Sequence, residues 1–316
     1  MAMDELRILV EINGFFTRAE ARELGYDDRA VSAAMRAKLW HRIRRGYYTF
    51  ADSWLQLDDV ERHRVRSHAV LRSLGGNVAL SHVSGVLEHG IATWGLDLSR
   101  VHVTRLDGAA GRVEGDVVHH EGVCVSADVL EVPVGRVLTP ARCVLEAGSR
   151  AGGGERALVM TDSLLHLGLS DDEHLAATFR RLEHWPWMRR MHVPVRMADG
   201  GAESPGESRG RWLFRVHRLP RPETQYQVYD SEHRLVATTD WCWPGEGLFG
   251  EFDGAIKYGR ILKPGQSVGE VVFAEKQRED LVREITGFGM VRIVWADYDR
   301  PKVTAWRIER LLRRVG

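Results

Sequence analysis

The chain has 316 residues, which is enough for two or three domains, each with a hydrophobic core of its own. It carries 44 Lys and Arg against 44 Asp and Glu, so its formal net charge is zero and any binding of nucleic acid must come from a local patch. No apolar run reaches the length of a membrane span, and the N-terminus lacks a signal-peptide pattern. The cysteines, Cys124, Cys143 and Cys242, show neither a disulfide nor a zinc spacing, which favours the cytoplasm.

The first sixty residues predict three short helices. Apolar residues recur with helical periodicity over Met3–Glu11. A second helix is indicated by the capping box Thr17–Glu20 and by Gly25, which suits the left-handed position after a helix. Asp27 then caps a third helix over Arg29–Leu39, with an inner face made of Val31, Ala34, Met35 and Leu39.

A basic β-hairpin follows over His41–Phe50, with Gly46 at its turn. Three helices and such a hairpin predict a winged helix-turn-helix domain over residues 1–57. In a complex with double-stranded DNA the third helix would read base edges, and the hairpin would neutralise phosphate. The residues expected to read base edges are Arg29, Ser32 and Arg36. Those expected to contact phosphate are Arg42, Arg44 and Arg45. The alternative is a solvated basic surface or a protein-docking module.

Residues 58–195 predict a charged connecting helix, 58–74, and a mixed α/β middle domain. Helices are expected over Ser81–His89, Glu155–Leu167 and Asp171–Leu182, with extended segments between the first two. The spacing of its histidines fits no strong ligand motif, so packed or surface positions are the better interpretation for His82, His89, His119 and His120. This region does not indicate a chemistry.

The third segment, 196–316, begins with a Gly- and Ser-rich stretch, Met197–Gly206, that predicts a flexible break. Beyond it the patterns predict a helix, three meandering strands, a long helix, a further strand and a last helix, which together make an α/β sandwich. The expected fold class of the whole chain is therefore α+β and multidomain.

Two of these strands form a hairpin with a distinctive distribution of charge. If Trp243 pairs with Leu248 across the Pro-Gly-Glu-Gly turn, Asp240 lies opposite Glu251, and Asp253 follows on the same face. Like charges about 5 Å apart destabilise a sheet unless a cation neutralises them. A divalent ion would do so, and the alternative is a solvated outer face.

The order of these elements and acidic residues resembles the PD-(D/E)XK restriction-endonuclease-like superfamily, in particular very-short-patch-repair and DUF559-type domains. The residues that carry the resemblance are Glu207, Asp240, Glu251 and Asp253, together with Glu275–Asp280 and Val291–Trp295. The resemblance implies that Asp240 and Glu251 bind Mg²⁺ and that Glu207 holds the metal shell or orients water. Mg²⁺ would then activate water for phosphodiester cleavage. The superfamily's usual lysine is Asp253 here, so Lys257 or Lys276 would have to replace it.

The N-terminal region resembles AbiEi-type antitoxins of type IV toxin–antitoxin systems. The matching segments are Gly14–Gly25, Arg44–Tyr48 and Ser81–Gly90. This resemblance implies a winged helix that binds its own promoter, and further domains that counter a cognate nucleotidyltransferase toxin. Two functions follow: a metal-dependent DNA endonuclease of phage or plasmid defence, or a non-catalytic antitoxin and autorepressor. A third possibility is that the later domains only bind protein partners.

Overall fold

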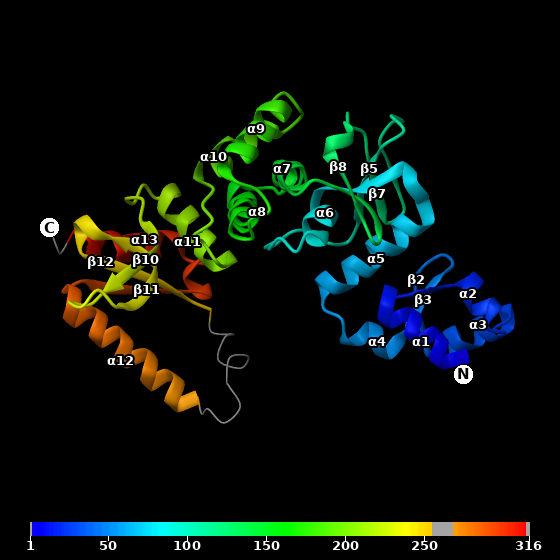
Figure 1. Cartoon of the computed structure of the whole chain (residues 1–316), viewed down its shortest axis with the longest axis horizontal. Coiled ribbons are helices and arrows are strands. Elements are labelled where there is room, and N and C mark those ends of the chain that lie inside the picture. Colours follow the sequence, from blue (N-terminus) through cyan, green and yellow to red (C-terminus); the bar gives the residue numbers. More distant parts are fainter. Residues whose placement is uncertain (1, 255–267, 314–316) are drawn as a thin grey trace. The chain divides into compact units, whose positions relative to one another are not determined.

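The structure is a computed structural model that describes residues 2–254 and 268–313, with side chains described over 3–254 and 277–313. The chain divides into two compact units (Figure 1). The first comprises Met1–Ala151 and Ala177–Arg189, and the second Gly152–Ala176 and Arg190–Gly316. Both contain helices and strands, which confirms the α+β class, while the boundaries expected at 57 and 195 stay predictions. None of the described helices combines the length and apolarity that a membrane span needs.

The N-terminal part of the first unit contains four helices and a small sheet. Its strands lie in the order β1-β3-β2 and pair antiparallel. The elements are α1 (Ala2–Asn13), β1 (Phe16–Thr17), α2 (Arg18–Glu23), α3 (Asp28–Arg36), β2 (Trp40–Arg44), β3 (Tyr47–Phe50) and α4 (Ala51–Gln56). One core holds them together, made of Leu6, Phe16, Ala21, Val31, Trp40, Tyr48 and Phe50.

The helix caps expected here are confirmed. The Thr17 hydroxyl accepts a hydrogen bond from the Glu20 amide at 3.2 Å, and the Glu20 carboxylate accepts one from the Thr17 amide at 2.7 Å. Gly25 has a φ of +90°. The Asp27 carboxylate accepts from the Ala30 amide at 2.7 Å at the start of α3. Each bond satisfies a helix-end donor that would otherwise lack a partner.

The inner face expected for the third helix is wrong at one residue. Leu39 is 58% exposed, although it was assigned to the core. Helix α3 ends at Arg36, and Lys38 has a φ of +55°, so the chain leaves the helical path before Leu39. Helical periodicity no longer applies there, and Trp40, which is 3% exposed, occupies the core instead.

The rest of the first unit is built on a six-stranded sheet in the order β6-β7-β5-β4-β9-β8. Strands β5 and β7 are parallel, as are β4 and β9. The elements are α5 (Asp59–Leu74), β4 (Val78–Leu80), α6 (His82–Glu88), β5 (Val101–Arg105), β6 (Arg112–Glu114), β7 (Val117–His120), β8 (Val129–Val132), β9 (Gly135–Leu138) and α7 (Pro140–Arg150). Helices α6 and α7 approach closely at Gly85, where an added Cβ would lie 2.3 Å from Cys143 Sγ.

The second unit contains a four-stranded sheet in the order β10-β11-β12-β13. Neighbouring strands are antiparallel except for β12 and β13, which are parallel. The elements are α8 (Gly154–His166), α10 (His192–Met197), α11 (Pro205–Val216), β10 (Glu223–Tyr229), β11 (Leu235–Trp243), β12 (Leu248–Asp253), α12 (Val268–Thr286), β13 (Gly289–Val294) and α13 (Pro301–Leu312). Helix α9 (Asp172–Leu182) spans the division between the units.

Helices cover both faces of this sheet. Trp241, Trp243 and Phe252 pack with side chains of α11 and α13. On the other face Cys242 and Phe249 pack with Val282 of α12. Trp241, Trp243 and Phe252 therefore lie on one face of the hairpin, and Cys242 and Phe249, both fully buried, lie on the other.

The stretch Met197–Gly206 is tied to the second unit by hydrogen bonds and is not a free linker. The Asp199 amide donates to the Asp162 carboxylate at 3.0 Å, and the Glu203 amide donates to Glu207 at 2.9 Å. Gly206 lies so near Phe252 that an added Cβ would approach its ring to 2.1 Å. Glycine is needed at this position for packing, so its presence does not indicate flexibility.

Gly210→Ala is expected to destabilise the second unit. A Cβ at Gly210 would lie 2.4 Å from Trp241 Cζ2, and Trp241 is fully buried. Overpacking of this kind costs about 1–3 kcal/mol, which exceeds the helix-propensity gain of about 1 kcal/mol. Urea unfolding followed by tryptophan fluorescence measures the loss. Gly245→Ala is the control, since nothing lies within 4 Å of its added Cβ. Wild-type stability for Gly210→Ala would contradict this packing.

His63 is expected to make stability depend on pH. Its Nε2 lies 2.8 Å from Ser84 Oγ and its Nδ1 3.0 Å from the Leu98 carbonyl, and burial lowers its pKa from 6.5 to about 4. The unfolded state therefore binds more protons between these values, so the free energy of unfolding falls as pH drops from 6.5 towards 4. The contribution of His63 is at most about 3 kcal/mol. Denaturation of His63→Gln across this range should show a shallower fall than wild type or His184→Gln.

Candidate nucleic-acid interface and acidic hairpin

The exposed face of α3 presents the residues predicted to read base edges. Arg29, Ser32 and Arg36 are all exposed, and their spacing places them along one side of the helix. The Ser32 hydroxyl donates to the Asp28 carbonyl at 2.7 Å, so its proton is engaged by its own helix. Its oxygen can still accept a hydrogen bond.

The β2–β3 hairpin presents the three arginines predicted to contact phosphate. Arg42 and Arg45 are exposed, and Arg44 is half-buried. The Arg44 Nη1 is buried and has no hydrogen-bond partner among the described residues. An open hollow with a volume of about 890 Å³ lies here, and it is lined by Arg18, Arg42, Ile43, Arg44, Arg45, Gly46, Tyr48 and Asp116. Four of its charged residues are arginines and one is an aspartate, so the hollow is positively charged.

Asp28, the first residue of α3, forms ion pairs with arginines outside that helix. The Asp28 carboxylate lies 2.7 Å from Arg18 and 3.0 Å from Arg22. The hydrogen bond from Arg18 lowers the pKa of Asp28, so this carboxylate stays ionised and its charge is offset locally. Arg29 and Arg36 are therefore not the cations that balance Asp28.

The acidic hairpin of the second unit has the register expected from its turn. Trp243 pairs with Leu248, Cys242 with Phe249 and Trp241 with Gly250, where the ladder between β11 and β12 ends. One residue further, Asp240 Oδ2 accepts a hydrogen bond from the Phe252 amide at 2.6 Å. The carboxylate thus takes a donor that a continued ladder would have paired with a backbone carbonyl.

The charge of Glu251 is partly balanced by arginines. Its Oε1 lies 3.5 Å from Arg278 Nη2 of α12, and its Oε2 lies 3.6 Å from Arg292 Nη2 of β13. Arg292 also lies 3.3 Å from Glu279. The cation expected beside the opposed acids is thus supplied, at Glu251, by protein side chains. Asp253 is half-buried on the same strand, two residues further.

Glu207 acts as a helix cap. It is 4% exposed, its Oε1 accepts from the Ser204 hydroxyl at 2.6 Å, and its Oε2 accepts from the Glu203 amide at 2.9 Å. Both carboxylate oxygens therefore stabilise the start of α11. Lys257 lies outside the described residues, and so does the side chain of Lys276.

The described acids do not form a three-ligand site for Mg²⁺. Within residues whose side chains are described, His82, His102 and His120 form the one group of three or more His, Cys, Asp or Glu whose ligand atoms lie within 4.8 Å of one another. Glu207, Asp240, Glu251 and Asp253 form no such group. Mg²⁺ requires several oxygen ligands, whereas Glu207, Asp240 and Glu251 each already contact protein donors.

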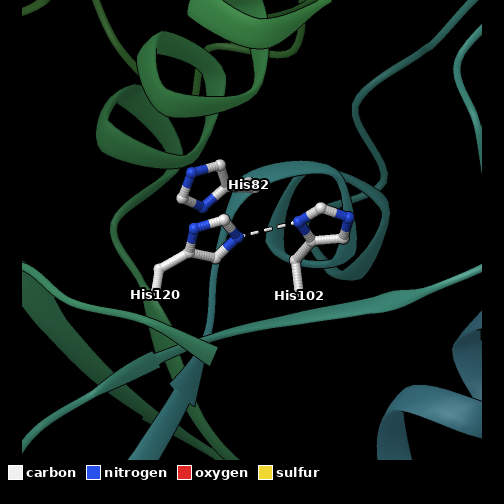
Figure 2. Close-up of side chains that lie close together, drawn as sticks. All are labelled: His82, His102 and His120. Atoms are coloured by element: carbon white, nitrogen blue, oxygen red, sulfur yellow. Dashed lines mark hydrogen bonds between the residues drawn. The ribbon is translucent and has the colours of Figure 1, made fainter. Parts of the chain in front are cut away.

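The histidine cluster lies in the first unit, and sequence reasoning missed it (Figure 2). His82 and His120 were noted for their spacing, but His102 was not. The parallel pairing of β5 with β7 places Thr104 opposite His120, so His102 lies two residues away on the same face. The alternation His102-Val-Thr104 beside Val118-His-His120 is the only sequence signal, and it becomes informative once the register is known.

Comparison with known proteins identifies a relationship for the N-terminal part. Residues 4–51 match a protein family described as transcriptional regulator, AbiEi antitoxin. No curated protein matches the chain. Among solved structures, the crystal structure of RV2827C protein from Mycobacterium tuberculosis is 14% identical, covers 69% of this chain and 84% of that chain, and has a TM-score of 0.38. A likeness this low carries no argument. The AbiEi part of the expected resemblance is confirmed for residues 4–51, and the nuclease-like part stays a prediction.

Proposed function

We propose that this protein is a transcriptional regulator of the AbiEi antitoxin type, whose N-terminal winged helix binds double-stranded DNA in the cytoplasm. The observation that carries the proposal is the coincidence of two independent features. The family match over 4–51 spans α1 through β3, and the same segment presents the exposed arginines of α3 and of the hairpin.

The two groups of basic residues have different roles in this proposal. Helix α3 enters the major groove, where Arg29, Ser32 and Arg36 contact base edges. The hairpin follows the phosphate backbone, and the open hollow lined by Arg42, Arg44 and Arg45 takes a phosphate group.

The remaining domains are assigned to a protein partner. The matched family is described as an antitoxin, and the resemblance implies a cognate nucleotidyltransferase toxin. We propose that the protein represses its own promoter with the N-terminal domain and counters this toxin with the rest of the chain.

Binding to the DNA upstream of its own gene should be specific and sensitive to salt. Arg42→Ala should weaken binding to all sequences and reduce the slope of log K against log salt by about 0.9, because one phosphate contact is lost. Arg36→Ala should weaken binding to the specific site by about 1–3 kcal/mol and relax its base preference. Fluorescence anisotropy at salt concentrations from about 50 to about 200 mM measures both effects.

Arg313→Ala is the control for these variants, because it removes an exposed arginine at the end of α13. It should bind DNA as the wild type does. If all three variants bind like the wild type, the assignment of α3 and the hairpin to DNA is wrong.

Metal-dependent cleavage of DNA is a second candidate function. It is favoured by the position of Asp240, whose carboxylate lies where the β11–β12 ladder ends, with Glu251 next on the facing strand. In this proposal Asp240 and Glu251 would hold the metal ion, and Lys257 or Lys276 would supply the positive charge that the superfamily's lysine provides. The commitment of Glu207 to its helix cap makes this candidate the weaker of the two.

Plasmid nicking with Mg²⁺ or Mn²⁺ tests the second candidate. Wild type and Asp299→Asn, which changes an exposed aspartate, should nick DNA, and Asp240→Asn and Glu251→Gln should not. These amide substitutions keep the side-chain shape while removing the charge that would bind a cation. Absence of nicking by the wild type, or equal nicking by all four proteins, excludes this role.

A further inference from the structure

Three histidine side chains converge in the first unit from three different elements. His82 begins α6, His102 lies on β5 and His120 ends β7 (Figure 2). The His102 Nδ1 lies 2.9 Å from the His120 Nε2. The rings of His82 and His120 stack, with centroids 3.6 Å apart and an angle of 13° between their planes. One ligand atom from each residue lies within 4.8 Å of the others.

A buried carboxylate lies beside one ring nitrogen of His82. Its Nδ1 lies 3.0 Å from Ser81 Oγ and 3.3 Å from Glu146 Oε2. Glu146 is 4% exposed, and this oxygen has no hydrogen-bond partner among the described residues. A carboxylate that faces one ring nitrogen of a histidine is the usual outer-shell arrangement of a metal-binding histidine, because it leaves the other nitrogen's lone pair available.

His102 is held by its backbone. Its amide donates to Ser84 Oγ at 2.8 Å, and the same oxygen lies 2.8 Å from His63 Nε2. The backbone of His102 is thus held by a buried network that leaves its ring nitrogens free of that network. One of the two facing nitrogens of His102 and His120 carries the proton that lies between them. When a metal ion binds both facing lone pairs, that ring keeps its proton on its other nitrogen and stays neutral.

The cluster consists of neutral imidazoles at physiological pH. Burial lowers the pKa of His102 to about 4 and that of His120 to about 3. Burial also lowers the pKa of His82.

We propose that His82, His102 and His120 bind one divalent transition-metal ion, of which Zn²⁺ is the test case. Three nitrogen ligands suit Zn²⁺, Co²⁺, Ni²⁺ or Cu²⁺ and are unsuited to Mg²⁺ or Ca²⁺. Three protein ligands leave the fourth position of a tetrahedral ion for water or another small ligand. This site lies apart from α3 and the hairpin in sequence, and it does not depend on the proposed function.

Metal binding requires a small, definite rearrangement. Zn–N bonds of about 2.0–2.1 Å in a tetrahedron place the ligand nitrogens about 3.3 Å apart, so the 2.9 Å separation of His102 and His120 must widen slightly. Two stacked parallel rings cannot both direct in-plane lone pairs at one ion. The ring of His82 or His120 therefore turns about its Cβ–Cγ bond, whose rotation is soft in histidine.

Metal titration of the untagged full chain tests the proposal. After treatment with a chelator, the protein should bind one equivalent of Zn²⁺ by calorimetry, and saturating Zn²⁺ should raise its melting temperature. Co²⁺ should give visible d–d absorption typical of a low-coordinate nitrogen site. His120→Gln should weaken binding by more than 10-fold, and Glu146→Gln by about 10–100-fold through loss of the orienting carboxylate.

His184→Gln is the matched control, because the side chain of His184 is 90% exposed and outside the cluster. It should bind Zn²⁺ as the wild type does. Two results would overturn the proposal: wild-type protein that gives no d–d absorption with Co²⁺, or His120→Gln that binds Zn²⁺ like His184→Gln. The Co²⁺ titration of the wild type decides the question even if His120→Gln does not fold.

Discussion

The buried polar groups of the first unit are arranged around the ion pairs of Arg142 with Asp128 and Glu146. Arg142 is fully buried, and it lies 2.6 Å from Asp128 and 2.9 Å from Glu146. Removing one partner of such a group costs about 3–5 kcal/mol, because an unpaired charge stays buried. The pair therefore holds Glu146 on α7 in the one position from which its second oxygen faces His82.

The acidic residues of the second unit and the arginines of α3 and the β2–β3 hairpin differ in how far other protein groups neutralise their charge. The acids of the second unit are engaged: Asp240 by a backbone amide, Glu207 by its own helix cap, and Glu251 by arginines. By contrast, the arginines of α3 and the hairpin are mostly exposed, and Arg44 keeps a buried nitrogen without a hydrogen-bond partner in the described residues. A charged group gains most from a ligand when no protein partner already compensates it. This difference favours DNA binding over cleavage.

Sequence patterns predicted the local features of the fold well because each depends on neighbouring residues. The cap at Thr17, the glycine after α2 and the register of the acidic hairpin follow from short-range sterics and hydrogen bonds. The same reasoning failed at Leu39, since a single residue with positive φ ended the periodicity. For Glu207 the resemblance implied a role in a metal site, and the structure shows its oxygens bonded to Ser204 and Glu203 at the start of α11.

The sequence by itself thus determined the α+β composition, the helix caps at Thr17 and Asp27, the register of the acidic hairpin and the basic character of the N-terminal segment. Tertiary structure alone decided which distant strands became neighbours, such as β5 beside β7 and β12 beside β13. Parallel pairing joins residues that are far apart in the chain, and no local energy term specifies its register. For that reason His82, His102 and His120 were scattered histidines in the sequence and became one cluster in the folded protein.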